Sequence, residues 1–242
     1  MTEVLDFGPA PHTAEPHAKI GEKLNWLRAG VLGANDGIVS VAGIVVGVAG
    51  ATTNSTAILT AGVAGLAAGA FSMAGGEYVS VSTQRDTEHA LLRLERQELE
   101  TMPEAEEREL AGLYEAKGLS PELARQVARE LTEKDALRAH AEAELGIDPD
   151  NLTNPWHAAW ASLLAFSAGA LLPLLAIMLV GTSQRVWACA AAVILGLTLT
   201  GWTSAKLGNA APGRAILRNV GAGALTMIVT YGIGVLFGVT VS

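Results

Sequence analysis

Five long apolar stretches constrain the fold of this chain more than any other feature of its sequence. A helix needs roughly 20 predominantly apolar residues to cross a hydrocarbon core of about 30 Å. A buried helix of a soluble protein could explain one such stretch, but five in one chain favour a membrane protein. The stretches are Ala29–Gly50, Ala57–Thr83, Trp156–Val180, Val186–Lys206 and Leu217–Val239. We therefore predict an all-α membrane protein with five transmembrane helices.

Charged residues are concentrated in one segment between the second and third apolar stretches. Of the 24 Asp and Glu residues, 18 lie between Gln84 and Asp150, together with nine of the 16 Lys and Arg residues. The net charge of -8 therefore describes this segment rather than the whole chain. Nucleic acid is not expected as a partner, because binding its phosphates needs a basic face.

The acidic segment is predicted to form a three-helix insert. Its helices are expected at about 84–101, 103–117 and 121–145, with a break in the third as an alternative to one continuous helix. Pro103 limits the first helix, and Ser120 followed by Pro121 has the residue types that begin a helix. The expected plan of the chain is a disordered cytoplasmic N-terminal tail (1–28), transmembrane helices one and two (29–83), an acidic cytoplasmic helical domain (84–152) and transmembrane helices three to five (153–242).

Lys and Arg residues near the ends of the predicted spans lie mainly on one side. They precede the first span, follow the second and lie between the fourth and fifth, whereas the other side has Arg185 alone. Basic residues favour the cytoplasmic side of a membrane. We therefore expect the N-terminus in the cytoplasm and the C-terminus outside.

Glycines recur at four-residue spacing within the apolar stretches. The pairs are Gly33/Gly37, Gly43/Gly47, Gly65/Gly69 and Gly234/Gly238. In lipid this spacing lets two helix backbones approach closely. We interpret these glycines as packing positions rather than as groups that take part in chemistry.

Two acidic residues interrupt the first two spans. Asp36 lies about seven residues into the first span and Glu77 about six residues before the inner end of the second, so both are expected roughly 10 Å below the cytoplasmic boundary. A carboxylate at that depth indicates an ion or proton pathway, although a hydrated carboxylate without a role is an alternative. Met73 is one turn from Glu77, and its thioether beside two carboxylates suits a borderline transition-metal ion, unless it is only core filler.

The insert carries three clusters of acidic residues at helical spacing. Carboxylates with one imidazole make a plausible site for iron, manganese or zinc, but Glu-rich helices are commonly just solvated faces. No Glu-x-x-His pair is present, so the signature of a ferritin-like di-iron centre is missing. The clusters are Glu95 with Glu98, Glu106 with Glu109, and His140 with Glu144.

Two sequence motifs carry a family resemblance. The runs Gly33-Ala34-Asn35-Asp36-Gly37 and Phe71-Ser72-Met73-Ala74-Gly75-Gly76-Glu77-Tyr78-Val79-Ser80, together with the five-span plan and its insert, resemble the vacuolar iron transporter (VIT) family. The resemblance implies a homodimer that moves ferrous iron, and often manganese, out of the cytoplasm in exchange for protons. It also implies that Asp36 and Met73 line the translocation path. The insert glutamates that correspond to the family's cytoplasmic metal-binding domain are Glu95, Glu98, Glu106, Glu109 and Glu144.

The sequence departs from the plant and parasite members of that family at two positions. Those members carry a glutamate two turns before the methionine, where this chain has Gly65, and Glu77 would supply the missing acid. A methionine that supports the insert's metal cluster in plant members is His140 here, which remains a suitable ligand. The Gly-Glu-Tyr form of the second-span motif resembles bacterial members, so a prokaryotic plasma membrane is expected.

The sequence predicts a proton-coupled exporter of divalent metal, with Fe2+ or Mn2+ as cargo. Zn2+ is a further ion that the sites could bind, and no permanent cofactor is expected. Membrane lipid, protons and a second copy of the chain are the expected partners. The alternative is a membrane-anchored metal-binding or partner-docking module without transport, which would have no use for acids within the spans. An intramembrane enzyme is disfavoured, because neither a Gly-x-Ser-x-Gly nor a His-Glu-x-x-His motif is present.

Overall fold

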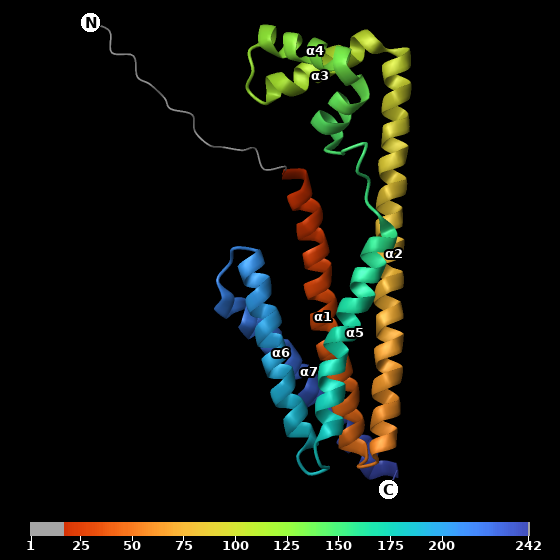
Figure 1. Cartoon of the computed structure of the whole chain (residues 1–242), viewed down its shortest axis with the longest axis vertical. Helices are drawn as coiled ribbons and strands as arrows, with labels where there is room; N and C mark the ends of the chain where they lie inside the picture. Colours follow the sequence, from red (N-terminus) through yellow and green to blue (C-terminus); the bar gives the residue numbers. More distant parts are fainter. Residues whose placement is uncertain (1–16, 242) are drawn as a thin grey trace, which may run out of the picture. The chain divides into compact units, whose positions relative to one another are not determined.

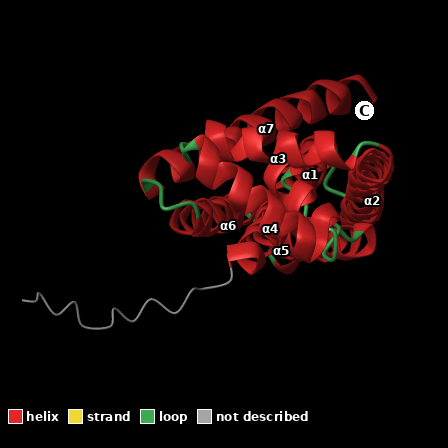
Figure 2. Ribbon diagram, turned by 90° about the horizontal axis from the view of Figure 1, so that it is seen from above, coloured by secondary structure: helices red, strands yellow, loops and turns green. Residues whose placement is uncertain are grey.

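The computed structural model describes residues 17–241, and all of its regular structure is helical (Figures 1 and 2). The elements are α1 (His17–Ala51), α2 (Ser55–Thr101), α3 (Pro103–Ala116), α4 (Pro121–His140), the π-helix η1 (Ala141–Leu145), α5 (Pro155–Leu179), α6 (Arg185–Leu207) and α7 (Pro212–Val241). Of the tail predicted to be disordered, residues 1–16 lie outside the described part and residues 17–28 belong to α1. After Pro16 the sequence has no proline before Pro103, and the only interruption of helix in the described part of that stretch is the turn at residues 52–54.

In the part of the chain that the structure describes, five helices are long and apolar enough to cross a membrane: α1, α2, α5, α6 and α7. This confirms the prediction of five spans. Many large apolar side chains on these helices point outward, among them Leu179, Leu195 and Ile228, which are 80%, 66% and 70% exposed. Such exposure is expected where lipid rather than water surrounds a protein.

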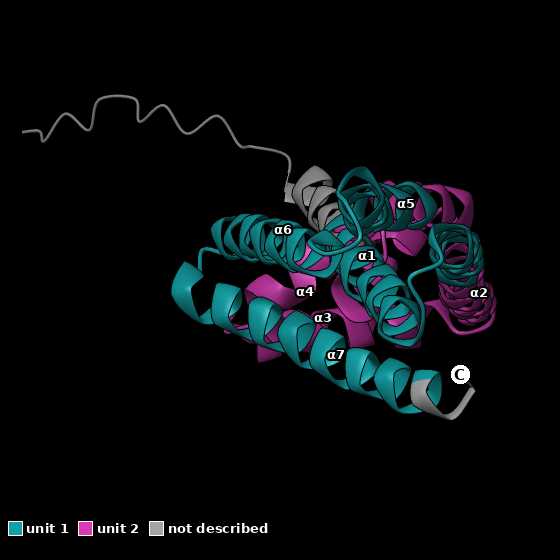
Figure 3. Cartoon of the chain, turned by 90° about the horizontal axis from the view of Figure 1, so that it is seen from below, with its two compact units in different colours: residues 1–73, 161–242 teal, residues 74–160 magenta. Residues whose placement is uncertain are grey.

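The chain divides into two compact units, coloured separately in Figure 3. Unit 1 comprises residues 1–73 and 161–242, and unit 2 comprises residues 74–160. Unit 1 contains most of the apolar helices, whereas unit 2 contains the acidic helices α3 and α4 with the second half of α2.

Unit 1 is a helical bundle in which α1 packs against both α6 and α7. Its core draws on all five of its helices through buried residues such as Val45 of α1, Ile58 of α2, Phe166 of α5, Val193 of α6 and Met227 of α7. The first helix therefore lies at the centre of the contacts that hold the bundle together.

Glycines allow the backbones in unit 1 to touch. A Cβ atom on Gly37 of α1 would lie 2.1 Å from the carbonyl oxygen of Phe166, and one on Gly169 of α5 would lie equally close to that of Ala34. A Cβ atom on Gly234 of α7 would likewise overlap the carbonyl oxygen of Gly47 on α1. The interpretation of the regularly spaced glycines as packing positions is therefore confirmed for Gly37, Gly47 and Gly234.

Unit 2 is organised by the second half of α2. The sequence predicted a separate helix from Gln84, but α2 continues without a break from Ser55 to Thr101, because neither proline nor glycine follows Gly76 until Pro103. Pro103 occupies the first turn of α3, and Ser120 caps α4 by accepting a hydrogen bond from the amide of Leu123. A small apolar core between these two helices includes Leu110, Ala111 and Ala128.

The chain changes direction near the end of α4. Asp135 has an extended conformation (φ -166°, ψ 91°) inside the helix, and its Oδ1 accepts a hydrogen bond from the amide of Arg138 at 3.0 Å. Asp135 thus caps a second helical segment, which passes into η1 and ends at Gly146 with a left-handed φ of 64°. This broken segment carries His140 and Glu144.

Candidate metal centre

His140 lies at the centre of a cluster of carboxylates in unit 2. Its side chain is fully buried, and its Nδ1 is 3.0 Å from Oε1 of Glu95, 3.7 Å from Oε2 of Glu144 and 3.8 Å from Oε2 of Glu106. Glu95 and Glu106 are also buried, with 4% and 5% of their surface exposed, whereas Glu144 is partly open to solvent. We call these four residues the His140 cluster.

Four structural elements position the ligating atoms of the His140 cluster. Glu95 comes from α2 and Glu106 from the first turn of α3, so one glutamate precedes Pro103 and the other follows it. His140 ends α4, and Glu144 lies in η1. A π-helical turn is rare and occurs often at functional sites, and here it sets the relative orientation of the imidazole and the last carboxylate.

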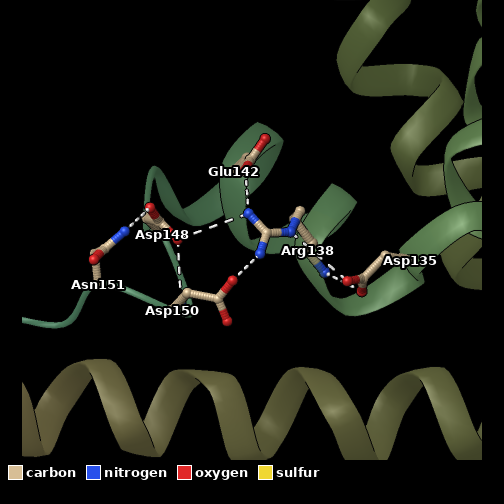
Figure 4. A network of polar contacts seen from close by, with 6 residues as sticks. All are labelled: Asp135, Arg138, Glu142, Asp148, Asp150 and Asn151. Carbon is tan, nitrogen blue, oxygen red and sulfur yellow. Dashed lines mark hydrogen bonds and ion pairs between the residues drawn. The ribbon is translucent and has the colours of Figure 1, made fainter. Parts of the chain in front are cut away.

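Arg138 forms ion pairs with the segment that follows η1 (Figure 4). Its guanidinium makes ion pairs with the carboxylates of Asp135, Glu142, Asp148 and Asp150. Lys117 at the end of α3 adds a hydrogen bond to the carbonyl oxygen of Ala143, at 3.4 Å. The turn that presents Glu144 is therefore fixed at both sides by basic residues.

Burial and mutual repulsion perturb the carboxylates of the His140 cluster. The pKa of Glu95 is raised from 4.5 to about 7, first because burial disfavours its charge and then because Glu144, Glu106, Glu98 and Glu109 are negative. Burial also raises the pKa of Glu106, with repulsion from Glu109 next, while the charge of His140 acts in the opposite direction. The metal-free cluster thus holds protons at a pH where an ordinary carboxyl group is ionised.

Several buried polar atoms of the cluster have no hydrogen-bond partner within residues 17–241. They are Oε1 of Glu95 and both ring nitrogens of His140, although Oε1 and Nδ1 are only 3.0 Å apart. Buried polar groups are nearly always satisfied, so these atoms need a partner. Ligands about 2.1 Å from one ion in octahedral geometry lie about 3 to 4 Å from one another. Glu95, His140 and Glu144 offer atoms that all lie within 4.8 Å of one another, so a cation would satisfy them together.

Comparison with known proteins places the chain in a family. A family model described as "VIT family" matches residues 27–235. The chain belongs to the VIT family. A relative named vacuolar iron transporter, from Acanthamoeba castellanii, is 40% identical over 98% of this chain and 87% of its own length. "Vacuolar iron transporter homolog 3" of Arabidopsis thaliana is 37% identical over 90% of this chain and 86% of its own length. "Vacuolar iron transporter homolog 1" of Oryza sativa is 40% identical over 89% of this chain and 75% of its own length. The family resemblance is confirmed, and VIT proteins are transporters rather than enzymes.

The membrane residues of this VIT protein have a different setting from the His140 cluster. Asp36 is half-buried on α1, and its Oδ1 accepts a hydrogen bond from the hydroxyl of Ser40 at 2.8 Å. Met73 is half-buried on α2 and packs against the core of unit 1. Glu77, one turn further along α2, belongs to unit 2 and is half-buried too. The predicted proximity of Asp36 and Glu77 stays a prediction, because the two residues belong to different units.

The other two predicted ligands of the insert lie outside the closest contacts of the His140 cluster. Glu98 is half-buried and Glu109 is exposed, and both are near enough for their charge to raise the pKa of Glu95. Sequence reasoning missed Arg138, the residue that pairs with four carboxylates near η1. Its only sequence signal is position, since it precedes His140 by two residues and is followed by acids at 142, 148 and 150.

Proposed function

We propose that this VIT family member exports divalent metal, ferrous iron or manganese, from the cytoplasm in exchange for protons. The observation that carries the proposal is the buried His140 cluster, whose orphaned nitrogen and oxygen atoms are spaced as ligands around one ion. The relatives named as iron transporters support iron as the first candidate cargo. Carboxylates with an imidazole suit Fe2+ and Mn2+, and also Zn2+.

The insert would capture metal on the cytoplasmic side. Glu95 and His140 would supply buried ligands, and the partly open Glu144 would exchange the ion with solvent. Glu98 and Glu109 would raise the local concentration of cations through their charge. Capture would release the protons that the elevated pKa of Glu95 keeps on the metal-free cluster.

The membrane site would consist of Asp36, Met73 and Glu77. Acidic side chains within a membrane bundle usually mark an ion or proton pathway. Either a divalent ion or protons would neutralise the two carboxylates, which gives a direct basis for exchange of one for the other. A homodimer would enclose this path between two protomers, with the N-terminus of each in the cytoplasm and the C-terminus on the opposite side. A prokaryotic plasma membrane is the location that we propose from the second-span motif.

Metal flux into proteoliposomes tests the proposal. Wild-type protein, Asp36→Ala and Glu77→Gln would be reconstituted, and uptake of iron, manganese and zinc would be followed with and without an imposed proton gradient. Metal flux through the wild-type protein should follow the proton gradient, and the Asp36→Ala substitution should abolish the metal flux. Glu100→Gln, an exposed acid on α2, is the matched control and should transport normally.

The outcomes separate the proposal from a membrane-anchored binding module. Normal transport by Asp36→Ala would remove Asp36 from the pathway, and flux that ignores the gradient would exclude exchange with protons. If wild-type protein binds metal but moves none, the chain is a binding module rather than a transporter.

A further inference from the structure

Arg185 is a buried cation in the part of unit 1 that has no acidic residue. Only 5% of its surface is exposed, although it is the first residue of α6. No Asp or Glu occurs in residues 37–76 or after Asp150, so neither α5, α6, α7 nor the α1–α2 turn offers it a carboxylate. Buried charges are costly unless they are paired. The structure therefore leaves this guanidinium in need of an anion.

The hydrogen bonds of Arg185 are too few to balance its charge. Its two terminal nitrogens donate to the carbonyl oxygen of Thr53 and to the hydroxyl of Ser55, both at 3.3 Å, and its Nε has no partner among the described residues. Both acceptors are neutral. The N-terminus of α6 adds to the imbalance, because its free amides carry partial positive charge and Gln184 makes no side-chain cap there.

A cavity of about 540 Å³ lies beside this cation, and Arg185 contributes to its lining. One end is polar, with the hydroxyls of Thr52, Thr53, Thr182 and Ser183. The rest is apolar and formed by α1, α6 and α7, including Val46, Ala190, Ile194, Ala224 and Ile228. The cavity thus has a cationic, hydroxyl-lined end and an apolar wall that runs along three membrane helices.

Aromatic residues indicate that the polar end of this cavity lies at a membrane surface. Trp187 and Tyr231 both line it and are 78% and 43% exposed. Trp and Tyr are enriched at the boundary between lipid and water. Asp36, by contrast, lies 15 residues before the end of α1, about 22 Å along the helix axis. The cavity is therefore distinct from the proposed metal site at Asp36.

We propose that this cavity binds one anionic phospholipid, with the phosphate against Arg185 and an acyl chain along the wall formed by α6 and α7. The phosphate would accept hydrogen bonds from the guanidinium, including the unpartnered Nε, and from the first free amides of α6. The hydroxyls of Thr182 and Ser183 would complete its contacts. The lipid would supply a counter-charge that none of the described residues beside Arg185 provides.

Binding of lipid to the purified, delipidated full chain in a neutral detergent tests this proposal. Phosphatidylglycerol and phosphatidylcholine with identical acyl chains would be titrated, with native mass spectrometry to count bound lipid and thermal unfolding to measure stabilisation. Inorganic phosphate would be a third ligand. Wild-type protein should retain one phosphatidylglycerol with an affinity about tenfold above that for phosphatidylcholine, the size expected of a charge-assisted hydrogen-bonded contact.

Two variants separate loss of the site from loss of folding. Arg185→Gln should abolish the preference for phosphatidylglycerol, whereas Arg214→Gln, an exposed Arg at the start of α7, should leave it intact. Ala224→Phe keeps Arg185 but fills the apolar part of the cavity, so it should weaken the binding of both phosphatidylglycerol and phosphatidylcholine. Metal flux is not the readout, so failure here leaves the proposed transport function untouched.

Three results would overturn the proposal. Equal binding of phosphatidylcholine would reduce the cavity to an unspecific apolar groove. Equal stabilisation by inorganic phosphate would make it a free-anion site without a lipid. A preference for phosphatidylglycerol that survives both Arg185→Gln and Ala224→Phe would place the lipid elsewhere on the protein.

Discussion

Unit 1 and unit 2 handle buried polar groups in opposite ways. In unit 1 charges are sparse, and close packing rests on glycines such as Gly37, whose backbone contacts that of Phe166. In unit 2 charges are dense, and three ionisable side chains, Glu95, Glu106 and His140, are buried together. The bundle gains stability from backbone proximity and dispersion contacts. The insert instead keeps an electrostatic conflict that only protons or a cation can relieve.

The difference separates contacts that stabilise the fold from a cluster that is suited to binding. A cluster of repelling acids is costly in a metal-free protein unless it holds protons, and a cation bound at the proposed site would remove that cost. A glycine contact between backbones, in contrast, has no affinity for a ligand. Substitutions in the two units should therefore have effects of different kinds.

The largest expected effect is that of Gly37→Leu in unit 1. A side chain at this position overlaps the backbone of α5, so α1 and α5 must separate, with a loss of more than about 3 kcal/mol of stability. Size-exclusion chromatography in detergent should show aggregate instead of a monodisperse peak. Gly221→Leu is the control, because a Cβ atom there meets nothing within 4 Å. A well-folded Gly37→Leu protein would contradict the packing described here.

In unit 2, Glu95→Gln should weaken metal binding and yet stabilise the metal-free protein. Removing one buried charge from the cluster relieves repulsion, so the free energy of local unfolding should rise by about 1 kcal/mol at pH 8. Metal affinity should fall about 100-fold, because a carboxylate ligand is lost. Isothermal titration with Mn2+ and hydrogen exchange of the α3 and α4 peptides measure the two effects. Loss of both stability and affinity would make Glu95 a structural residue.

Metal binding should depend on pH because the pKa of Glu95 is raised to about 7. A raised carboxyl pKa means that the folded, metal-free state keeps a proton between pH 4.5 and 7 that the unfolded state has lost, so its stability falls as pH rises through that window. Metal must displace this proton, and the apparent affinity should therefore fall about tenfold for each pH unit below 7 and level off above it. In Glu95→Gln the slope of log apparent affinity against pH should decrease by one, because one proton fewer is released on binding. An unchanged slope would assign the proton to another group.

The smallest effect is expected for Arg138→Ala. Its partners are exposed carboxylates, and surface ion pairs contribute little individually. The variant should keep its fold and lose about threefold in Mn2+ affinity, because Glu144 loses the fixed turn that presents it. Arg125→Ala, which removes an isolated exposed ion pair with Glu122, is the control and should bind normally. Equal losses in both variants would point to a general effect of charge.

The sequence predicts the bundle better than the insert, for a physical reason. In a membrane the pattern of hydropathy dictates which residues form helices, and Gly37 and Gly47 indicate close helix crossings. Asp36 and Glu77 stand out because acids are rare in such a setting. In the insert acids are common, so no pattern tells the buried Glu106 from the exposed Glu109. That difference arises from tertiary packing.

The position of the break at Asp135 and the π-helical turn after His140 cannot be predicted from the sequence either. Asp135 lies in a helical pattern without proline or glycine, and its role as an internal cap becomes visible only from its backbone angles. Without the break, the spacing of His140 and Glu144 indicates two residues on one helical face but not that the imidazole is buried. The unbroken path of α2 was likewise not predicted, since the change from apolar to charged residues near Gln84 resembles a domain boundary.

The continuity of α2 gives unit 2 a mechanical property. Glu77 and Glu95 are 18 residues apart on one uninterrupted helix, which amounts to five turns, so they share a face about 27 Å apart. A stiff rod of that length behaves as a lever. A tilt of about 5° at the Glu77 end displaces Glu95 by about 2 Å, comparable to a whole metal–ligand bond. If metal binds at the proposed sites, a change of coordination at one end would rotate the helix at the other end, about 27 Å away.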